Sequence, residues 1–198
     1  MDALGLLPEL MPTPVCKGGH LGSGLPTVTD PVAQQVVKHF LGPKIDYLFH
    51  TDSYGYRRSK NAQSIHNATQ RCFKAAWAID MDIKEFYDNI DHELMMKAVR
   101  FYTQERWILL YLERWLKAGI MKERLFQERD KGTPLCGVAS PILTNIFLHI
   151  AFDKWMQKTQ PYVQFECYCD DIIVHCKSEQ QTRFIKVRIN ERMKECKM

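Results

Sequence analysis

Hydrophobic positions recur with a helical period in several parts of the chain. After Asp30 and Pro31, an N-cap and a proline at the first helical position, apolar residues return every three or four positions until Gly42. Further helices are predicted where the same period follows an N-cap, a serine–proline pair or a capping box. Their ranges are 61–76, 91–102, 104–118, 140–156 and 178–198.

Alternating or continuous apolar runs predict strands between these helices. The strands are expected at 76–82, 122–127, 165–168 and 172–176. Because strands and helices interleave, we expect an α+β fold. A turn-rich basic loop is predicted at 52–60, and the glycine- and proline-rich residues 1–24 are interpreted as a loop segment preceding a domain at 25–198.

Composition and charge leave a wide choice of function. Of the 198 residues, 45% are hydrophobic and 25% charged, as in ordinary globular proteins, and the net charge of +4 is compatible with a nucleic-acid partner. No apolar run has membrane-spanning length, and the N-terminus lacks the basic region of a signal peptide. We therefore expect a soluble, cytoplasmic protein without a membrane partner. The seven cysteines include no C-x-x-C pair, which favours free thiols over a zinc site.

Two adjacent aspartates interrupt one of the most apolar stretches of the chain. Asp170 and Asp171 lie in F-E-C-Y-C-D-D-I-I-V-H-C, between two predicted strands. Burying like charges together is costly, and a divalent cation removes that cost because carboxylates are among its preferred ligands. A solvated turn is the alternative interpretation, because aspartate is a common turn residue. The apolar flanks and the lack of an accompanying glycine or asparagine count against that turn.

A third carboxylate is available on the strand predicted at 76–82. Asp80 and Asp82 lie on one face of this strand, and Ile83 lies on the other. If the strand pairs with the hairpin so that Asp82 lies opposite Asp170, the carboxylates can hold two metal ions. Such a pair of ions supports in-line phosphoryl transfer.

Four segments together resemble the motifs of a known family. They are S-Y-G-Y-R-R at 53–58, D-I-K-E-F-Y-D-N-I-D-H at 82–92, G-T-P-L-C-G-V-A-S-P-I-L-T-N-I at 132–146 and Y-C-D-D at 168–171. In this order and spacing they resemble the reverse transcriptases (maturases) encoded by bacterial group II introns, from about Leu25 to the last residue. The resemblance implies the palm of a reverse transcriptase, an antiparallel sheet packed on helices, with partial fingers and no thumb.

The resemblance implies roles for particular residues. Asp82 and Asp170 would bind two Mg²⁺ ions, with Mn²⁺ as a substitute, and the carbonyl of Ile83 would be a further ligand. Asp171 would support the site. Tyr87 resembles the aromatic gate that excludes a 2′-hydroxyl, although core packing is an equal alternative. Other implied contacts to the nucleotide involve Pro134, Leu135, Gly137 and Tyr168, and contacts to nucleic acid involve Arg57 and Arg58.

The implied activity is RNA-directed DNA polymerisation, in which a dNTP is added to the 3′ end of a primer on an RNA template. The implied partners are an RNA template, a DNA primer, dNTPs and a group II intron RNA. Two departures favour the alternative of a catalytically idle RNA-binding remnant. The family's P-Q-G-G carries Leu135 and Cys136 here, and only Lys17 and His20 stand where a triphosphate-binding arginine is usual. A palm-fold cyclase would require a G-G-[DE]-[DE]-F hairpin, which the sequence lacks.

Overall fold

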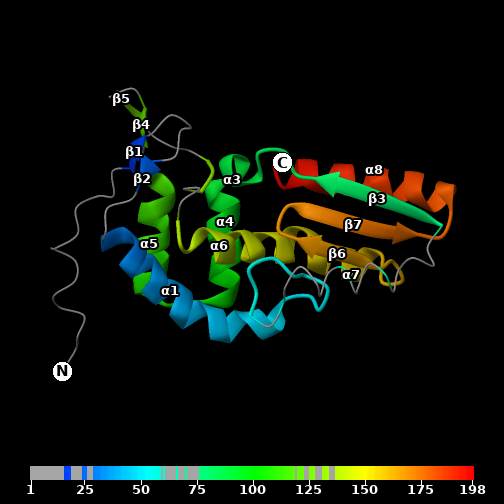
Figure 1. The fold of residues 1–198 in the computed structure, drawn as a ribbon, viewed down its shortest axis with the longest axis horizontal. Coiled ribbons are helices and arrows are strands. Elements are labelled where there is room, and N and C mark those ends of the chain that lie inside the picture. The colour runs from blue at the N-terminus through cyan, green and yellow to red at the C-terminus, as the bar shows by residue number, and fades with distance from the viewer. Residues whose placement is uncertain are drawn as a thin grey trace.

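One end of the molecule is formed by helices, and the other holds a three-stranded sheet with further helices packed against it (Figure 1). The computed structural model describes residues 16–18, 24–25, 29–58, 60, 66, 70, 76–118, 120–122, 125–127, 131–133 and 137–198. The helices are α1 (Thr29–Ile45), η1 (Asp46–Leu48), α3 (Phe86–Asn89), α4 (His92–Tyr102), α5 (Arg106–Lys117), α6 (Ser140–Leu148), η2 (His149–Asp153), α7 (Lys154–Thr159) and α8 (Glu179–Glu195). The predicted α+β class is confirmed.

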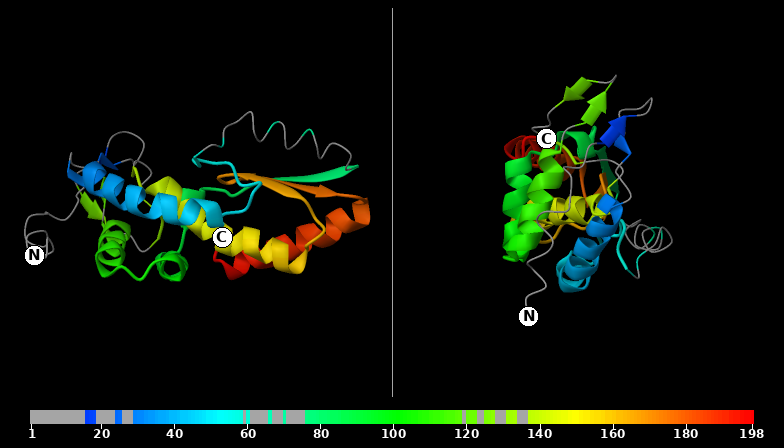
Figure 2. Two further views of the ribbon diagram at one scale, coloured as in Figure 1. Left: turned by 90° about the horizontal axis from the view of Figure 1, so that it is seen from below. Right: turned by 90° about the vertical axis from the view of Figure 1, so that its left-hand side faces the viewer.

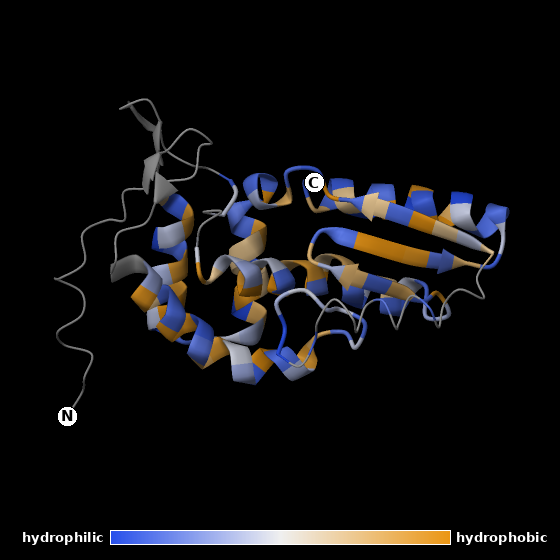
Figure 3. Ribbon diagram, in the orientation of Figure 1, coloured by the Kyte–Doolittle hydropathy of each residue, from blue (hydrophilic) through white to orange (hydrophobic). Residues whose placement is uncertain are grey.

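An antiparallel sheet in the order β3-β7-β6 carries the aspartates. Its strands are β3 (Trp77–Asp82), β6 (Phe165–Tyr168) and β7 (Asp171–Cys176), close to the ranges predicted from apolar runs. The central strand β7 is strongly hydrophobic over most of its length, and its first residue is an aspartate (Figure 3). A central strand must be apolar on at least one face because both its edges are paired and its packed side is covered.

The packed face of this sheet rests on η2, α7 and α8 (Figure 2). Alternate residues of all three strands point toward these helices, as the two-residue period of a strand requires. The buried cluster on this face comprises Ile79, Phe152, Met156, Val163, Phe165, Cys167, Ile172, Val174, Cys176, Ile185, Ile189 and Met193. The opposite face is therefore the one that presents Asp80, Asp82 and Asp171.

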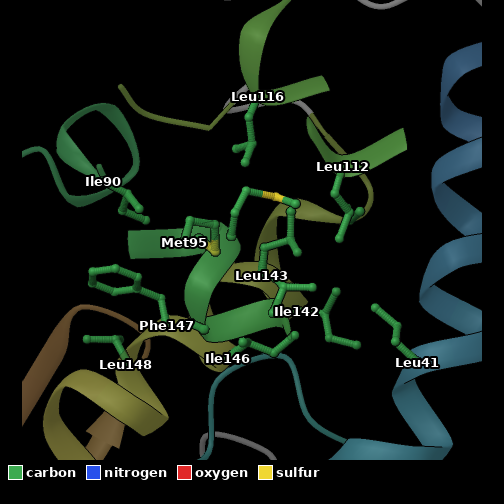
Figure 4. Close-up of a cluster of buried hydrophobic side chains, with 14 of the residues drawn as sticks. Leu41, Ile90, Met95, Leu112, Leu116, Ile142, Leu143, Ile146, Phe147 and Leu148 are labelled. Carbon is green, nitrogen blue, oxygen red and sulfur yellow. The ribbon is translucent and has the colours of Figure 1, made fainter. Parts of the chain in front are cut away.

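A second core joins α1, α4, α5 and α6 at the other end (Figure 4). Leu41 of α1 approaches Ile142 of α6, while Met95 of α4 lies among the side chains of α5 and α6. The α6 helix is buried on nearly all sides, so its sequence is almost uniformly apolar. Both cores meet at Ile83, whose side chain packs against each of them.

The predicted helices are largely confirmed. Those predicted at 91–102, 104–118, 140–156 and 178–198 correspond to α4, α5, α6 to α7, and α8. The carboxylate of Asp91 accepts a hydrogen bond from Leu94 N (3.0 Å), and the hydroxyl of Ser178 accepts one from Gln181 N (3.2 Å). Both are the N-caps that the sequence predicts. The helix predicted at 61–76 lies almost entirely outside the described residues.

Helix α1 continues beyond its predicted end at Gly42. It includes Gly42 and Pro43 and ends at Ile45. Pro43 has no N–H and therefore costs one helical hydrogen bond. Leu41 and Ile45, four positions apart, are both fully buried, and tertiary packing of this face outweighs the local cost.

A small second sheet corrects two predictions. Its order is β2-β1-β4-β5, with β1 (Cys16–Gly18), β2 (Gly24–Leu25), β4 (Ile120–Lys122) and β5 (Leu125–Gln127). The expected strand at 122–127 is thus a hairpin with Lys122 paired to Leu125. Part of the expected N-terminal loop is a strand, because Lys17 pairs in parallel with Met121, a distant partner that no local pattern reveals.

A single π-helical turn, η2, joins α6 and α7 into one long helix. Within it, His149 Nδ1 donates to the carboxylate of Asp153 (3.0 Å), and the thiol of Cys167 donates to the same carboxylate (3.7 Å). All three side chains are buried, so these bonds satisfy groups that would otherwise be costly. They tie the long helix to β6, the strand that leads into the aspartate pair.

Among the described helices, none is both long and apolar enough to cross a membrane.

Arg57 holds the basic loop together. Its Nη1 donates to the carbonyls of His50 and Ser53 (2.6 and 2.8 Å). Its Nη2 and Nε donate to the carbonyl (2.7 Å) and carboxylate (3.0 Å) of Asp46. Only 7% of its side chain is exposed. The loop therefore depends on one guanidinium for four hydrogen bonds.

We expect Arg57→Ala to lower the free energy of unfolding by about 2–3 kcal/mol, because buried carbonyls lose a charged donor. Arg57→Lys should recover only part of the loss, because one ammonium cannot reproduce the fork geometry. The exposed neighbour supplies the control, since Arg58→Ala should stay within about 0.5 kcal/mol. Urea unfolding of the three variants measures this, and equal losses for Arg57→Ala and Arg58→Ala would contradict it.

Candidate active site

Three aspartates meet at one end of the three-stranded sheet. Asp82, the last residue of β3, is directly opposite Asp171, the first residue of β7. Asp170 precedes Asp171 in the turn that joins β6 to β7. Residues directly opposite in an antiparallel pair share a face, so Asp82 and Asp171 project from the side away from α7 and α8. The expected register is thus wrong by one residue, because β7 begins at Asp171 and leaves Asp170 in the turn.

The charges in this cluster repel one another. Partial burial raises the pKa of the Asp171 carboxyl above its usual range, and the nearby carboxylates of Asp170, Asp82 and Asp80 raise it further. Like charges opposite each other destabilise a strand pair. The cluster is therefore poised to gain stability from a bound cation.

Carboxylate oxygens are suitable ligands for Mg²⁺, which keeps several of its own waters and needs only one or two protein carboxylates. Within the described ranges, no three His, Cys, Asp or Glu side chains lie close enough together to hold one metal ion. The donor set thus fits an ion bound through one or two carboxylates and completed by water or substrate oxygens.

Tyr87 lies beside the aspartate turn. It belongs to the short helix α3, and its ring packs edge-on against Phe86 at 5.7 Å between centroids. Burial raises its pKa to about 12, with a further contribution from the charge of Asp170. The structure therefore brings this residue to the carboxylates and also places it against the core, so both sequence-based interpretations describe part of its environment.

The start of the 132–146 motif is hydrogen-bonded to α3 and to the residue that follows it. Thr133 N donates to the carbonyl of Tyr87 (2.6 Å) and Gly132 N to that of Ile90 (2.7 Å). Gly132 has a φ of +83°, and a Cβ there would lie 2.7 Å from the carbonyl oxygen of Asp88. Only glycine fits this approach without strain.

The loop at 52–55 supports the aspartate turn from the other side. It runs beside β6, where Tyr54 N donates to the carbonyl of Cys167 (2.8 Å). A Cβ on Gly55 would lie 2.4 Å from Cys169 Sγ and 2.7 Å from Cys169 N. Asn145 of α6 donates to the Gly55 carbonyl (2.8 Å). The sequence analysis did not single out Gly55 or Asn145, although Gly55 lies in the 53–58 motif and Asn145 in the 132–146 motif.

Comparison with known proteins identifies this arrangement. Residues 17–198 match the family described as reverse transcriptase (RNA-dependent DNA polymerase). The chain belongs to the reverse transcriptase family.

Two relatives are 31% identical to this chain, and one of them is named as encoded by a group II intron. Protein YkfC of Escherichia coli (strain K12) is 31% identical over 144 residues, covering 68% of this chain and 37% of that protein. The group II intron-encoded protein LtrA of Lactococcus lactis subsp. cremoris is 31% identical over 134 residues, covering 67% of this chain and 22% of that protein. The predicted family, the group II intron-encoded reverse transcriptases, is confirmed, and the chain spans only 22–37% of the length of these relatives.

A solved structure agrees on the fold of this chain. Apo telomerase from Candida tropicalis, truncated from its C-terminal domain, superposes with a TM-score of 0.59 at 14% identity. The match covers 80% of this chain and 36% of that one. At this identity the likeness concerns the fold alone, and it confirms the predicted reverse transcriptase palm.

The structure describes only some of the other predicted site residues. Tyr168 is half-buried and opposite Asp171 on the carboxylate face, and Gly137 accepts a hydrogen bond from Ser140 N (3.1 Å). The carbonyl of Ile83 accepts one from Phe86 N (3.2 Å), which leaves one lone pair for another partner. Pro134, Leu135 and Cys136 lie outside the described residues.

Arg57 and Arg58 differ in how much of each guanidinium is available to contact a phosphate. The guanidinium of Arg57 is committed to the loop, which leaves it little capacity for phosphate. Arg58 is exposed and borders a cavity of about 350 Å³ between α1, the loop and α6. Lys38, His39 and Tyr56 line the same cavity.

We expect Asp171→Asn to raise the melting temperature at neutral pH in the absence of divalent ions. Because the folded-state pKa of Asp171 is above its ordinary value of 3.8, the folded chain binds more protons, and stability falls as pH rises through that window. Asp171→Asn removes this loss of stability, so its higher melting temperature relative to wild type should disappear below about pH 3.8. Thermal melts in EDTA across this range measure it. A variant less stable than wild type at neutral pH would contradict the predicted repulsion.

Proposed function

We propose that this chain forms the catalytic core of an RNA-directed DNA polymerase, which adds deoxynucleotides to a primer 3′ end on an RNA template. The observation that carries the proposal is the register between β3 and β7. It brings Asp82 opposite Asp171 and beside the turn that contains Asp170. Membership of the reverse transcriptase family supports the same reaction.

Asp82, Asp170 and Asp171 would hold two Mg²⁺ ions, with the carbonyl of Ile83 as a further ligand. Polymerases of this family generally use divalent metals, and Mn²⁺ could replace Mg²⁺. When bound, such ions lower the pKa of the primer 3′-hydroxyl and stabilise the charge of the departing pyrophosphate. The repulsion among the carboxylates supports this assignment because cation binding would relieve it.

The protein groups orient the reactants. Tyr87, next to the carboxylates, would lie under the sugar of the incoming dNTP and exclude a 2′-hydroxyl. Pro134, Leu135 and Gly137 would line the nucleotide site, and so would Tyr168, which lies opposite Asp171 on the carboxylate face of the sheet. Arg58 would contact the phosphates of template or primer, whereas we assign Arg57 to the loop itself.

The second candidate is a catalytically idle RNA-binding remnant. It is favoured by Leu135 and Cys136, which replace the polar and small residues usual at that box. In this case the palm would persist as a scaffold for binding a group II intron RNA. We place the domain at residues 25–198 in both cases.

Primer extension distinguishes the two candidates. Purified protein is incubated with poly(rA)–oligo(dT), dTTP and Mg²⁺, beside an Asp170→Ala/Asp171→Ala control. Extension that disappears in the control supports the polymerase. No extension, with RNA still retained in a gel shift, supports the idle remnant.

A further inference from the structure

A short segment of the basic loop covers the outer edge of β6. In the sheet order β3-β7-β6, β6 has a partner on one side only among the described strands. On its other side Ser53 pairs with Cys167 in parallel. Tyr54 N donates to the carbonyl of Cys167 (2.8 Å), and Cys167 N donates to the carbonyl of Asp52 (2.9 Å). Residues 52–54 therefore extend the sheet next to the strand that leads into the aspartate turn.

The next residue of this segment packs against the aspartate turn. Gly55 is buried, and a Cβ there would lie only 2.7 Å from the backbone nitrogen of Cys169. Cys169 has a left-handed backbone with a φ of 58°, which is unfavourable for a residue other than glycine. Such a conformation persists only where its surroundings enforce it. The close packing of Gly55 is one of the contacts that hold Cys169, and with it Asp170, in place.

A buried asparagine holds Gly55 from the other side. Asn145 of α6 donates from its Nδ2 to the Gly55 carbonyl oxygen (2.8 Å). Its side chain is buried in a helix whose other residues are mostly apolar. A buried carboxamide without a partner destabilises a fold, so this hydrogen bond is what makes an asparagine acceptable at the position. Because α6 is packed on nearly all sides, it gives the bond a rigid support.

We propose that Asn145 is a positioning residue of the metal site, which sets the place of Asp170 through the Gly55 carbonyl. The inference rests on the proposed polymerase function. Without the hydrogen bond, Gly55 can move away from Cys169, and the left-handed turn can relax. A displacement of about 1 Å in a reacting group can cost about a hundredfold in rate. A side chain that acts only through the loop can therefore limit the reaction.

The first test compares Asn145→Ala with Arg192→Ala in single-turnover primer extension, with rates expressed per folded molecule. Arg192 of α8 is the matched control because it also donates to a distant carbonyl, that of Ala151 (2.8 Å), but on the packed side of the sheet. Asn145→Ala should lower the rate at saturating dTTP by about tenfold or more, with a nearly unchanged KM for dTTP. Arg192→Ala should stay within about twofold of wild type. Equal losses in the two variants, or none in Asn145→Ala, overturn the proposal.

Two further measurements do not depend on polymerisation. The amide protons of Tyr54 and Cys167 report the pairing of the loop with β6, and their hydrogen exchange should be about tenfold faster in Asn145→Ala than in Arg192→Ala. The affinity for Mn²⁺ should fall about tenfold in Asn145→Ala, a loss typical of residues that orient metal ligands. If either quantity is unchanged in Asn145→Ala, the proposal is overturned.

Asn145→Thr serves as a second variant should Asn145→Ala not fold. Threonine has a volume similar to that of asparagine, but its shorter side chain donates within its own helix and leaves the Gly55 carbonyl without this donor. The same losses are expected. Failure of the wild-type chain to extend a primer would instead count against the polymerase function, while the exchange rates would still test the positioning role, so the two failures are distinguishable.

Discussion

Asp82→Asn is expected to reduce the rate of nucleotide addition by at least about a thousandfold, because an amide cannot replace a metal-binding carboxylate in the transition state. The fold should persist, since Asp82 is exposed at the end of β3 and its loss removes a like charge opposite Asp171. The rate is measured with enzyme in excess over primer, so that a single turnover is observed.

Asp80→Asn is the matched control for this substitution. Asp80 lies two residues earlier on the same face of β3, where it is opposite Ile173. Asp80→Asn removes one negative charge from the same strand but leaves the end of the sheet intact. We therefore expect a rate within about tenfold of wild type. Equal losses in both variants would indicate that charge alone matters and that Asp82 has no special role.

Gly55→Ala should lower both stability and activity. The added Cβ would lie 2.4 Å from Cys169 Sγ and 2.7 Å from its backbone nitrogen, so the loop or the aspartate turn must shift. Overpacking of this kind costs about 1–3 kcal/mol. A displacement of the reacting groups by about 1 Å can cost about a hundredfold in rate. Urea unfolding measures the change in the free energy of unfolding, and single-turnover primer extension measures the change in the rate of nucleotide addition.

Gly42→Ala controls for the loss of glycine itself. A Cβ at Gly42 would meet only Ile142 Cδ1 at 3.9 Å, an ordinary contact, and alanine favours the helix that contains it. This variant should be as active as wild type and slightly more stable. Gly55→Ala with wild-type activity would mean that the turn tolerates movement and that the loop does not support it.

The carboxylate-bearing sheet was predictable because its signals are local. The alternation up to Asp82 and the apolar runs around Asp170 and Asp171 identify the strands, and a two-residue period assigns each side chain to a face. The exact pairing was not predictable. Whether Asp82 is opposite Asp170 or Asp171 depends on where β7 begins, and one residue of turn length changes it.

The missed features depend on contacts between distant segments. Gly55 must be glycine because the backbone of Cys169, more than a hundred residues away, approaches it. Arg57 looks like an exposed basic loop residue in sequence, yet three carbonyls and a carboxylate close around it. Contacts of this kind with distant segments leave no hydrophobic periodicity in the sequence from which they could be predicted.

The proposed metal site is tested most directly by the binding of Mn²⁺, measured by electron paramagnetic resonance in the wild-type chain and in Asp82→Asn and Asp170→Asn. We expect saturable binding of Mn²⁺ to the wild type that is markedly weakened in both variants, while the melting temperatures of the variants stay at or above that of the wild type. Equal Mn²⁺ binding in all three proteins, with higher stability in the variants, would show that these aspartates repel one another without holding an ion, and the proposed active site would be wrong.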